Sequence, residues 1–471
     1  MPATAQATLS PPRLPQQRLA HWLAAHQALA LATLALLAMT AGIGRIVTHP
    51  PAPTSEETPA WWPISLNVAE GRGYTACYEN YFPFCSTTAD SPTAMREPVP
   101  VLLFAAVAAL TRESLLAASL VELALHAAIV VAVFFLAREL FDPIVALVAA
   151  GLWAIYPPAL KMVPQVSGDL TAALMMTAGM YWLVRARRSG QLAHWLVSGL
   201  CWGLAVLSRS AALAVAGALA AGIVVEKAAA MRRGGPGVRQ WAPPIVGFVL
   251  AISLAMSPWV IRNELVFHSP VLTSTLTAYN LYRHNHVVAS DGYLRIVGSA
   301  EAQTEVTRLM GQAVNLPQGT VDEVQMSAVY QREALQIIKA YPVRYLALSA
   351  YRFLPLWFDW QVAEAYGRHT TRWDAVIMAL QASLLALALT GLANSWRQSW
   401  PLAMAVVATS AEYMVIISLL RYIVPVMPLV IILSAAGMGR IAGAWRARKT
   451  VAQAHNVTAV YNTRHDEAAP T

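Results

Sequence analysis

Two adjacent carboxylates, Glu56 and Glu57, follow the first long apolar run of the chain and begin the segment EETPAWWPISLNVAEGRGY, which ends at Tyr74. A carboxylate that lies at a bilayer surface, partly removed from water, can accept a proton from a reacting hydroxyl group. The same side chains could instead cap the following helix or interact with its dipole. Both interpretations place this segment at the mouth of a membrane helix.

Other charged residues also lie beside apolar runs. Asp169, in SGDL, precedes such a run and could cap a helix. Arginine can bind a phosphate through two parallel hydrogen bonds, but a basic side chain can also simply extend to the phosphates of ordinary lipids. The basic residues at predicted outer helix ends are Arg96, Lys161, Arg209, Arg262 and Arg421.

Histidine and cysteine residues give weaker signals. His284 and His286 have no clear third ligand nearby, so we expect a solvated loop rather than a metal site. No metal is indicated, although a divalent ion would be compatible with the sequence. Cys77 and Cys85 lie in a predicted outer loop, where an oxidising compartment would allow a disulfide. Cys201 lies in an apolar run and is interpreted as a small core residue.

The composition indicates whether the chain folds in water or in a membrane. The chain of 471 residues is 57% hydrophobic and 12% charged, and its mean hydropathy is +0.48. These values indicate a polytopic membrane protein rather than a soluble one. The formal charge of +8 is concentrated next to apolar runs, where basic residues orient helices and meet anionic lipid. A nucleic-acid partner is therefore not predicted.

The positions of the apolar runs and basic clusters predict about ten membrane crossings with both ends in the cytoplasm. Residues 99–110 form too short a run to cross and are predicted to lie along the interface. The predicted parts of the chain are a cytoplasmic tail at 1–27, a membrane domain at 28–442 with outer loops at 47–113 and 260–373, and a basic cytoplasmic tail at 443–471. The end of that tail, after Thr450, is predicted to be disordered.

Several motifs in order resemble the GT-C superfamily of integral-membrane glycosyltransferases, in particular its bacterial branch related to protein mannosyltransferases and aminoarabinose transferases. The first outer loop carries AEGRGY and then PTAMREPVPVLL. Later matches are AIYPPAL, GLAVLSRSAAL, PWVIRN and RYIVPVMPL, so that the resemblance covers roughly residues 28 to 442. One departure is that Glu57 stands where relatives commonly have aspartate, and Trp61 where a tyrosine often stands.

The resemblance implies an all-α GT-C fold and transfer of a sugar, with inversion, from a polyprenyl-phosphate donor to an acceptor. It implies that Glu57, or in second place Glu56, is the general base, and that Asp169 contacts the acceptor or supports the base. The five basic residues named above would bind the donor phosphate, whose negative charge increases in the transition state. No cofactor is required.

The implied partners are membrane lipid, the lipid-linked sugar donor, and an acceptor that is a protein, a lipid or a polysaccharide. The implied location is the cytoplasmic (inner) membrane, with the active site facing the periplasm or exterior. Two other functions remain open at this point: a transporter or flippase of lipid-linked sugars, and an inactive assembly partner of a glycosyltransferase. A transporter would be expected to carry its charges at mid-membrane, whereas nearly all charges here lie at predicted helix ends, Glu122 being the exception.

Overall fold

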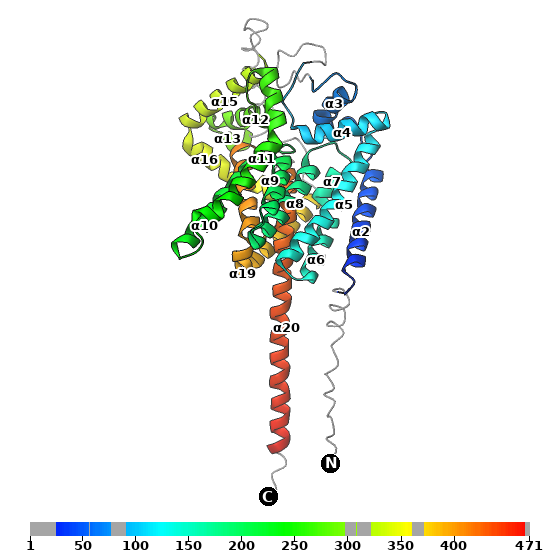
Figure 1. Cartoon of the computed structure of the whole chain (residues 1–471). Helices are drawn as coiled ribbons and strands as arrows, with labels where there is room; N and C mark the ends of the chain where they lie inside the picture. The colour runs from blue at the N-terminus through cyan, green and yellow to red at the C-terminus, as the bar shows by residue number, and fades with distance from the viewer. Residues whose placement is uncertain are drawn as a thin grey trace.

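The fold of the described residues is helical. The computed structural model describes residues 25–55, 57–76, 91–296, 308, 322–359 and 372–466. Among them, the only β-interaction is an isolated antiparallel bridge between Thr75 and Pro92. Long helices form a bundle, and shorter helices gather over one of its ends (Figure 1). The predicted all-α membrane fold is confirmed.

The long helices consist of apolar sequence whose backbone groups bond within each helix, as a lipid environment requires. In the described part of the chain, six segments are long and apolar enough to cross a membrane. They are α2 (Gln27–Thr48), α5 (Leu115–Leu140), α10 (Ala212–Arg232), α11 (Val238–Phe267), α19 (Arg372–Ile416) and Leu420–Trp445, which joins η2 (Leu420–Val426) to α20 (Met427–Asp466). The chain is therefore a multi-pass membrane protein.

Three further helices complete the bundle. They are α6 (Pro143–Ala154), α8 (Asp169–Ser189) and α9 (Leu192–Val206). With 21 residues, α8 is about 30 Å long, enough to cross the hydrocarbon layer. Its many small and apolar side chains are buried against α5 and α9, so this helix lies inside the bundle.

Two ion pairs bring the C-terminal ends of three helices together. Arg187 of α8 contacts Glu226 of α10 at 2.7 Å, and Arg188 of α8 contacts Glu139 of α5 at 2.9 Å. These contacts define one end of the bundle, which carries the basic cluster that the sequence predicts to face the cytoplasm. We call it the basic end.

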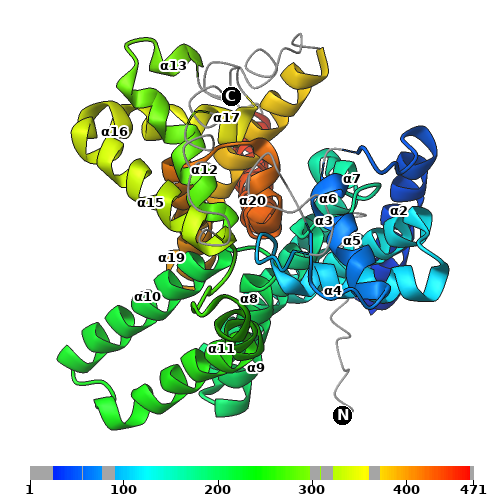
Figure 2. The same ribbon diagram turned by 90° about the horizontal axis from the view of Figure 1, so that it is seen from above.

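The opposite end is covered by shorter helices, as Figures 1 and 2 show. They are α3 (Thr58–Ala69), α4 (Pro98–Thr111), α7 (Pro157–Met162), α12 (Leu276–Asn285), η1 (His286–Ala289), α13 (Tyr293–Ile296), α15 (Glu323–Ala340), α16 (Pro342–Tyr351) and α17 (Phe353–Phe358). Helices α3 and α4 pack together through buried apolar side chains that include Trp61 and Phe104. This packing fixes the start of α3, where Glu57 lies.

Two expected boundaries are wrong, at the end of α11 and in the C-terminal tail. Helix α11 continues through Pro258 to Phe267, so the residues from 260 to 267 are helical rather than the start of a loop. A proline inside a helix removes only one backbone donor, and membrane helices tolerate it. The two spans expected at 375–392 and 402–419 are confirmed as the two helices of α19, which join across a kink at Ser395. Helix α20 extends to Asp466, through residues expected to be disordered.

The orientation in the membrane remains a prediction, and reporter fusions can test it. Fusions at Arg188 and Arg233 are expected to report cytoplasm, because basic residues are retained on that side. A fusion at Arg72, in the turn after α3, is expected to report the outside. A cytoplasmic signal at Arg72 together with an outside signal at Arg188 would invert the orientation and place the shorter helices inside the cell.

Candidate active site

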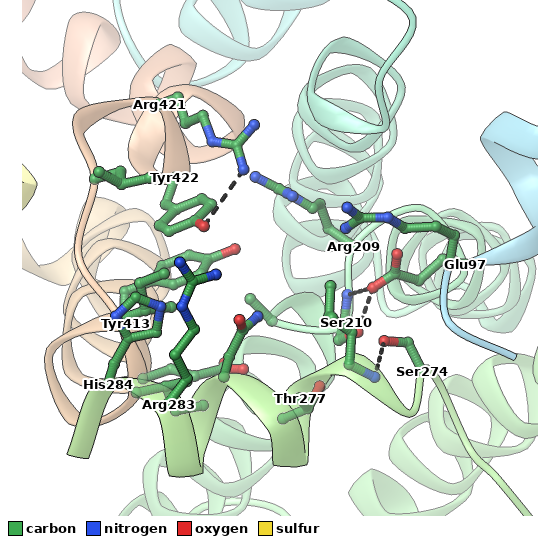
Figure 3. Close-up of a pocket in the computed structure, with 18 of the residues that line it drawn as sticks. Glu97, Arg209, Ser210, Ser274, Thr277, Arg283, His284, Tyr413, Arg421 and Tyr422 are labelled. Atoms are coloured by element: carbon green, nitrogen blue, oxygen red, sulfur yellow. Dashed lines mark hydrogen bonds between the residues drawn. The ribbon is translucent and has the colours of Figure 1, made fainter. Parts of the chain in front are cut away.

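A cavity of about 220 Å³ lies at the covered end of the bundle. Its walls come from the start of α3, the segment before α4, the connection between α9 and α10, α12, the end of α19 and η2 (Figure 3). Four of the predicted site residues line it: Glu57, Arg96, Arg209 and Arg421. They are distant in sequence, and the fold brings them together.

Glu57 forms an ion pair with Arg421 of η2. It occupies the N-cap position of α3, yet its side chain makes no capping hydrogen bond. The capping alternative is therefore wrong for this side chain. Its carboxylate is 11% exposed, and its Oε2 atom has no hydrogen-bond partner among the described residues. One oxygen is thus held by Arg421, while the other has no partner in the described part of the chain.

The surrounding arginines control the charge of Glu57. Burial disfavours its ionised form, but the positive charges of Arg421, Arg96 and Arg209 together outweigh burial and hold the pKa of Glu57 below its ordinary value of 4.5. Glu57 is therefore ionised at neutral pH. An ionised carboxylate can accept a proton, which a general base must do.

Asp169 and Arg209 form a second ion pair, at 2.6 Å. Asp169 lies in the first turn of α8 and is fully buried, whereas Gly168 occupies the N-cap position. Burial opposes the charge of Arg209, but Asp169 outweighs it and raises the pKa of Arg209 above its ordinary range. Asp169 does not line the cavity. Its evident role is to hold the guanidinium of Arg209 at the cavity wall.

Arg96 differs from the other two arginines because no carboxylate pairs with it among the described residues. Its guanidinium lies over the ring of Trp61, 5.1 Å from the ring centroid, and the residue is 8% exposed. The neighbouring Glu97 accepts hydrogen bonds from the backbone N–H of Ser210, at 2.8 Å, and from its hydroxyl group. This contact joins the segment before α4 to the connection between α9 and α10 that carries Arg209, which we call the Arg209 loop. Arg96 and Arg209 are therefore held at one wall of the cavity.

Two tyrosines support the same wall. Tyr422 stacks on Tyr413 with ring centroids 4.7 Å apart. The guanidinium groups of Arg421 and Arg209 lie 4.8 Å and 5.1 Å from the centroid of the Tyr422 ring. Cations are attracted to the face of an aromatic ring. The stack therefore keeps the two like-charged groups close together.

Arg262 and Lys161 are not among the residues that line the cavity. Arg262 donates hydrogen bonds to the carbonyl oxygens of Thr93 and Tyr74, at 2.9 and 3.0 Å. Glu323 accepts hydrogen bonds from the Thr93 hydroxyl and the Ala94 N–H, at 2.7 and 2.8 Å. Arg262 thus holds the backbone segment that leads to Arg96 in place. Lys161 lies in α7, away from the cavity wall.

His284 lines the cavity, although the sequence places it in a solvated loop. His284 and His286 are 5% and 8% exposed, and they belong to α12 and η1, so the solvated-loop prediction is wrong. Burial and the neighbouring charges of Arg283 and Arg352 hold the pKa of His284 well below its ordinary value, so that it is neutral. No cluster of three metal-ligating residues was found in the described part of the chain.

Glu412 and the residues of α12 are part of the cavity wall that the sequence reasoning missed. A signal for Glu412 existed, because a carboxylate within an apolar run, here TSAEYMVI, is unusual in a membrane segment. The residues of α12 carried no comparable signal. Glu56, Cys77 and Cys85 lie outside the described residues, so the choice between the two glutamates and the disulfide remain predictions.

Comparisons with known proteins agree with this architecture. Residues 90–261 match the family model described as dolichyl-phosphate-mannose-protein mannosyltransferase. Those residues include the motif PTAMREPVPVLL, the Arg209 loop and most of α11. No curated protein matches the sequence at a significant level.

Structures of one archaeal enzyme show the same fold at low sequence identity, and a structure of a second protein matches less well. The archaeal oligosaccharyltransferase AglB from Archaeoglobus fulgidus, in complex with an inhibitory peptide and a dolichol-phosphate, matches with a TM-score of 0.55 and 17% identity, over 92% of this chain and 52% of that one. The same enzyme tethered to an acceptor peptide matches with a TM-score of 0.54 and 15% identity, over 92% and 51%. ArnT from Cupriavidus metallidurans bound to undecaprenyl phosphate has 14% identity over 90% and 80%, with a TM-score of only 0.39.

The chain is a multi-pass helical membrane protein whose fold is like that of the archaeal oligosaccharyltransferase. The predicted GT-C fold is confirmed, and residues 90–261 are those that match the mannosyltransferase family within it. The chain spans about half the length of the AglB structures.

Proposed function

We propose that this protein is an inverting membrane glycosyltransferase that moves a sugar from a polyprenyl-phosphate donor to an acceptor hydroxyl or amide group. The observation that carries the proposal is the convergence of an ionised carboxylate, Glu57, with the three arginines Arg96, Arg209 and Arg421 in one cavity. A phosphate leaving group requires positive charge, and an attacking hydroxyl requires a base.

The chemistry follows from these groups. The acceptor loses its proton to Glu57 while its oxygen or nitrogen bonds to the anomeric carbon of the sugar. The bond between that carbon and the phosphate oxygen breaks, and the electron pair leaves with the lipid phosphate. Arg96, Arg209 and Arg421 stabilise the negative charge that develops there. Attack opposite the leaving group inverts the anomeric centre.

The ion pair between Glu57 and Arg421 couples donor binding to the base. A carboxylate whose pKa is depressed by arginine is a weak base. When the donor phosphate enters, it competes with Glu57 for the Arg421 guanidinium. The pull on Glu57 then weakens and its pKa rises towards the range in which proton transfer is efficient. Donor binding thereby prepares Glu57 to act.

The comparisons support a lipid-phosphate donor. The matching family model is named for a dolichyl-phosphate-mannose donor, and the AglB structure contains a dolichol-phosphate and a peptide. We propose that the membrane is the cytoplasmic (inner) membrane and that the cavity faces the periplasm or exterior, since the basic end matches the cytoplasmic pattern. The acceptor would be a protein, a lipid or a polysaccharide, and the bound lipid would include both the donor and ordinary membrane lipid.

A transporter or an inactive partner is the alternative to an enzyme, and one experiment distinguishes them. The lipid-linked sugars of a deletion strain are profiled to find the donor that accumulates, and that donor is then given to the purified protein in detergent with a membrane extract as acceptor source. A glycosyltransferase is expected to consume the donor and release polyprenyl phosphate. Donor that stays intact in detergent, where no transport can occur, would contradict the proposal.

A further inference from the structure

Glu412 is a carboxylate in the cavity wall that the proposed mechanism does not use. It lies near the end of α19, next to Tyr413 of the stacked tyrosine pair. Its Oε2 atom is buried and has no hydrogen-bond partner among the described residues. No basic side chain among the described residues forms an ion pair with Glu412, although the cavity is rich in arginine.

A buried carboxylate oxygen without a partner is costly, and such groups are rare unless a ligand or water completes them. The neighbouring His284 does not supply a charge, because its pKa is held well below the ordinary range and the ring is neutral. Glu57 also has an unpartnered Oε2 atom, but its other oxygen forms an ion pair with Arg421, whereas Glu412 has no ion pair among the described residues. Glu412 is therefore available to a bound molecule.

The cavity has two chemically different walls, and Figure 3 shows them facing one another. One wall carries Arg209 and Arg421, which suit a phosphate. The facing wall is formed by α12 and the segment before it and presents the uncharged polar residues Ser274, Thr277 and Asn280, with Arg283 near the end of the same helix. Hydroxyl and amide side chains suit the hydroxyl groups of a sugar.

We propose that Glu412 is a sugar-recognition residue, which accepts hydrogen bonds from O–H or N–H groups of the sugar carried by the lipid-phosphate donor. The phosphate then lies against the arginine wall, and the sugar extends towards Glu412 and the polar face of α12. The cavity of about 220 Å³ is smaller than the ~300–1,000 Å³ of sites that enclose drug-sized ligands. It matches the head of a donor better than a whole lipid. The inference rests on the proposed function and adds the position of the sugar.

The test separates the two parts of the donor. Binding of undecaprenyl phosphate is compared with binding of undecaprenyl phosphate linked to a neutral hexose and to an amino sugar, using the full-length protein in nanodiscs. Glu412→Ala is expected to weaken binding of the preferred sugar-linked lipid by about 10-fold, the size of one buried hydrogen bond. Its binding of undecaprenyl phosphate is expected to stay within about 3-fold of the unchanged protein.

Glu412→Gln keeps the shape and one acceptor oxygen, so it serves if the alanine variant folds poorly. It is expected to retain partial binding where the sugar donates an O–H group, and to lose binding as fully as the alanine variant where the sugar carries an ammonium group. Glu264→Gln, an exposed carboxylate on α11 outside the cavity, is the matched control.

Several results would overturn the assignment. Equal losses for the bare and the sugar-linked lipid would place Glu412 at the phosphate or make its role structural. Unchanged binding with reduced turnover would place it on the acceptor side. If the unchanged protein bound neither lipid, both this inference and the proposed function would fail, whereas binding unaffected by either Glu412 variant would overturn this inference alone.

Discussion

Glu57→Gln is expected to lower turnover by about 10² to 10⁴-fold, the contribution of a general base. The glutamine keeps the shape of the side chain but cannot accept the acceptor proton. The measurement is consumption of the lipid-linked donor by the purified variant. The loss should fall on turnover, because the donor phosphate is held by arginines that remain in place.

The main difficulty with this variant is that it leaves Arg421 buried without its carboxylate, which can destabilise the fold. Glu57→Asp is the matched control, since aspartate keeps the carboxylate and its negative charge. It is expected to retain much more activity than the glutamine variant, with a similar elution profile and thermal stability. Near-normal turnover in Glu57→Gln would refute the base.

The neighbouring carboxylate provides a second comparison. Glu56→Gln is expected to be milder than Glu57→Gln, as the sequence pattern ranks Glu57 first. A dead Glu56 variant beside an active Glu57 variant would reverse this ranking.

The pKa of Glu57 also predicts how kcat/KM depends on pH. In the free enzyme, a pKa of Glu57 below 4.5 means that the acidic limb of kcat/KM should lie below that pH. Replacing Arg96 with a neutral residue removes one of the charges that lower the pKa, so the limb should then move to higher pH. An acidic limb near neutral pH in the unchanged protein would contradict the depressed pKa.

Arg96→Ala is expected to lower kcat/KM by about 10²-fold, as removal of one donor to a developing negative charge typically does. Arg96 is the most informative arginine because it has no carboxylate partner among the described residues, so its loss leaves no acid unpaired. Arg96→Lys should restore activity only in part, since lysine keeps the charge but lacks the planar fork that binds two phosphate oxygens. Binding of undecaprenyl phosphate and turnover are both measured.

Arg262→Ala is the comparison within the same segment. Arg262 holds backbone carbonyl groups and does not line the cavity. Its loss is expected to lower thermal stability and to affect donor binding only through the position of Arg96.

Two results would contradict these assignments. Full activity of Arg96→Ala would assign the Arg96 side chain to contacts with ordinary lipid. A specific loss of lipid-phosphate binding in a stable Arg262→Ala variant would return Arg262 to the phosphate site.

The sequence by itself determined the class of the fold. Apolar runs long enough to cross a bilayer must form helices, because lipid offers no hydrogen bonds to the backbone. Basic clusters such as Arg185–Arg188 then identify one end of the bundle. In the structure, the C-terminal ends of α5, α8 and α10 meet at that end. The expected end of a span before Pro258 failed because that proline does not interrupt α11, whereas the kink at Ser395 divides α19 into two helices where two spans were expected.

The sequence also contained the arginines that line the cavity, but it did not distinguish them from the other arginines at helix ends. Arg96, Arg209, Arg262 and Arg421 all stand at helix ends next to apolar runs, and pattern alone treats them as equals. Only tertiary packing separates them, because Arg262 turns to backbone carbonyl groups while the other three line the cavity.

The partner of Glu57 was decided by tertiary structure alone. Arg421 lies near the other end of the chain, and the packing of η2 against α8 brings it to the cavity. Charge pairing acts over a few ångströms and is independent of separation along the sequence, so a local pattern cannot predict it. The same reason explains why the sequence alone does not assign a role to Glu412, a lone acid in an apolar run, which the fold places in the same cavity lining as residues of α12.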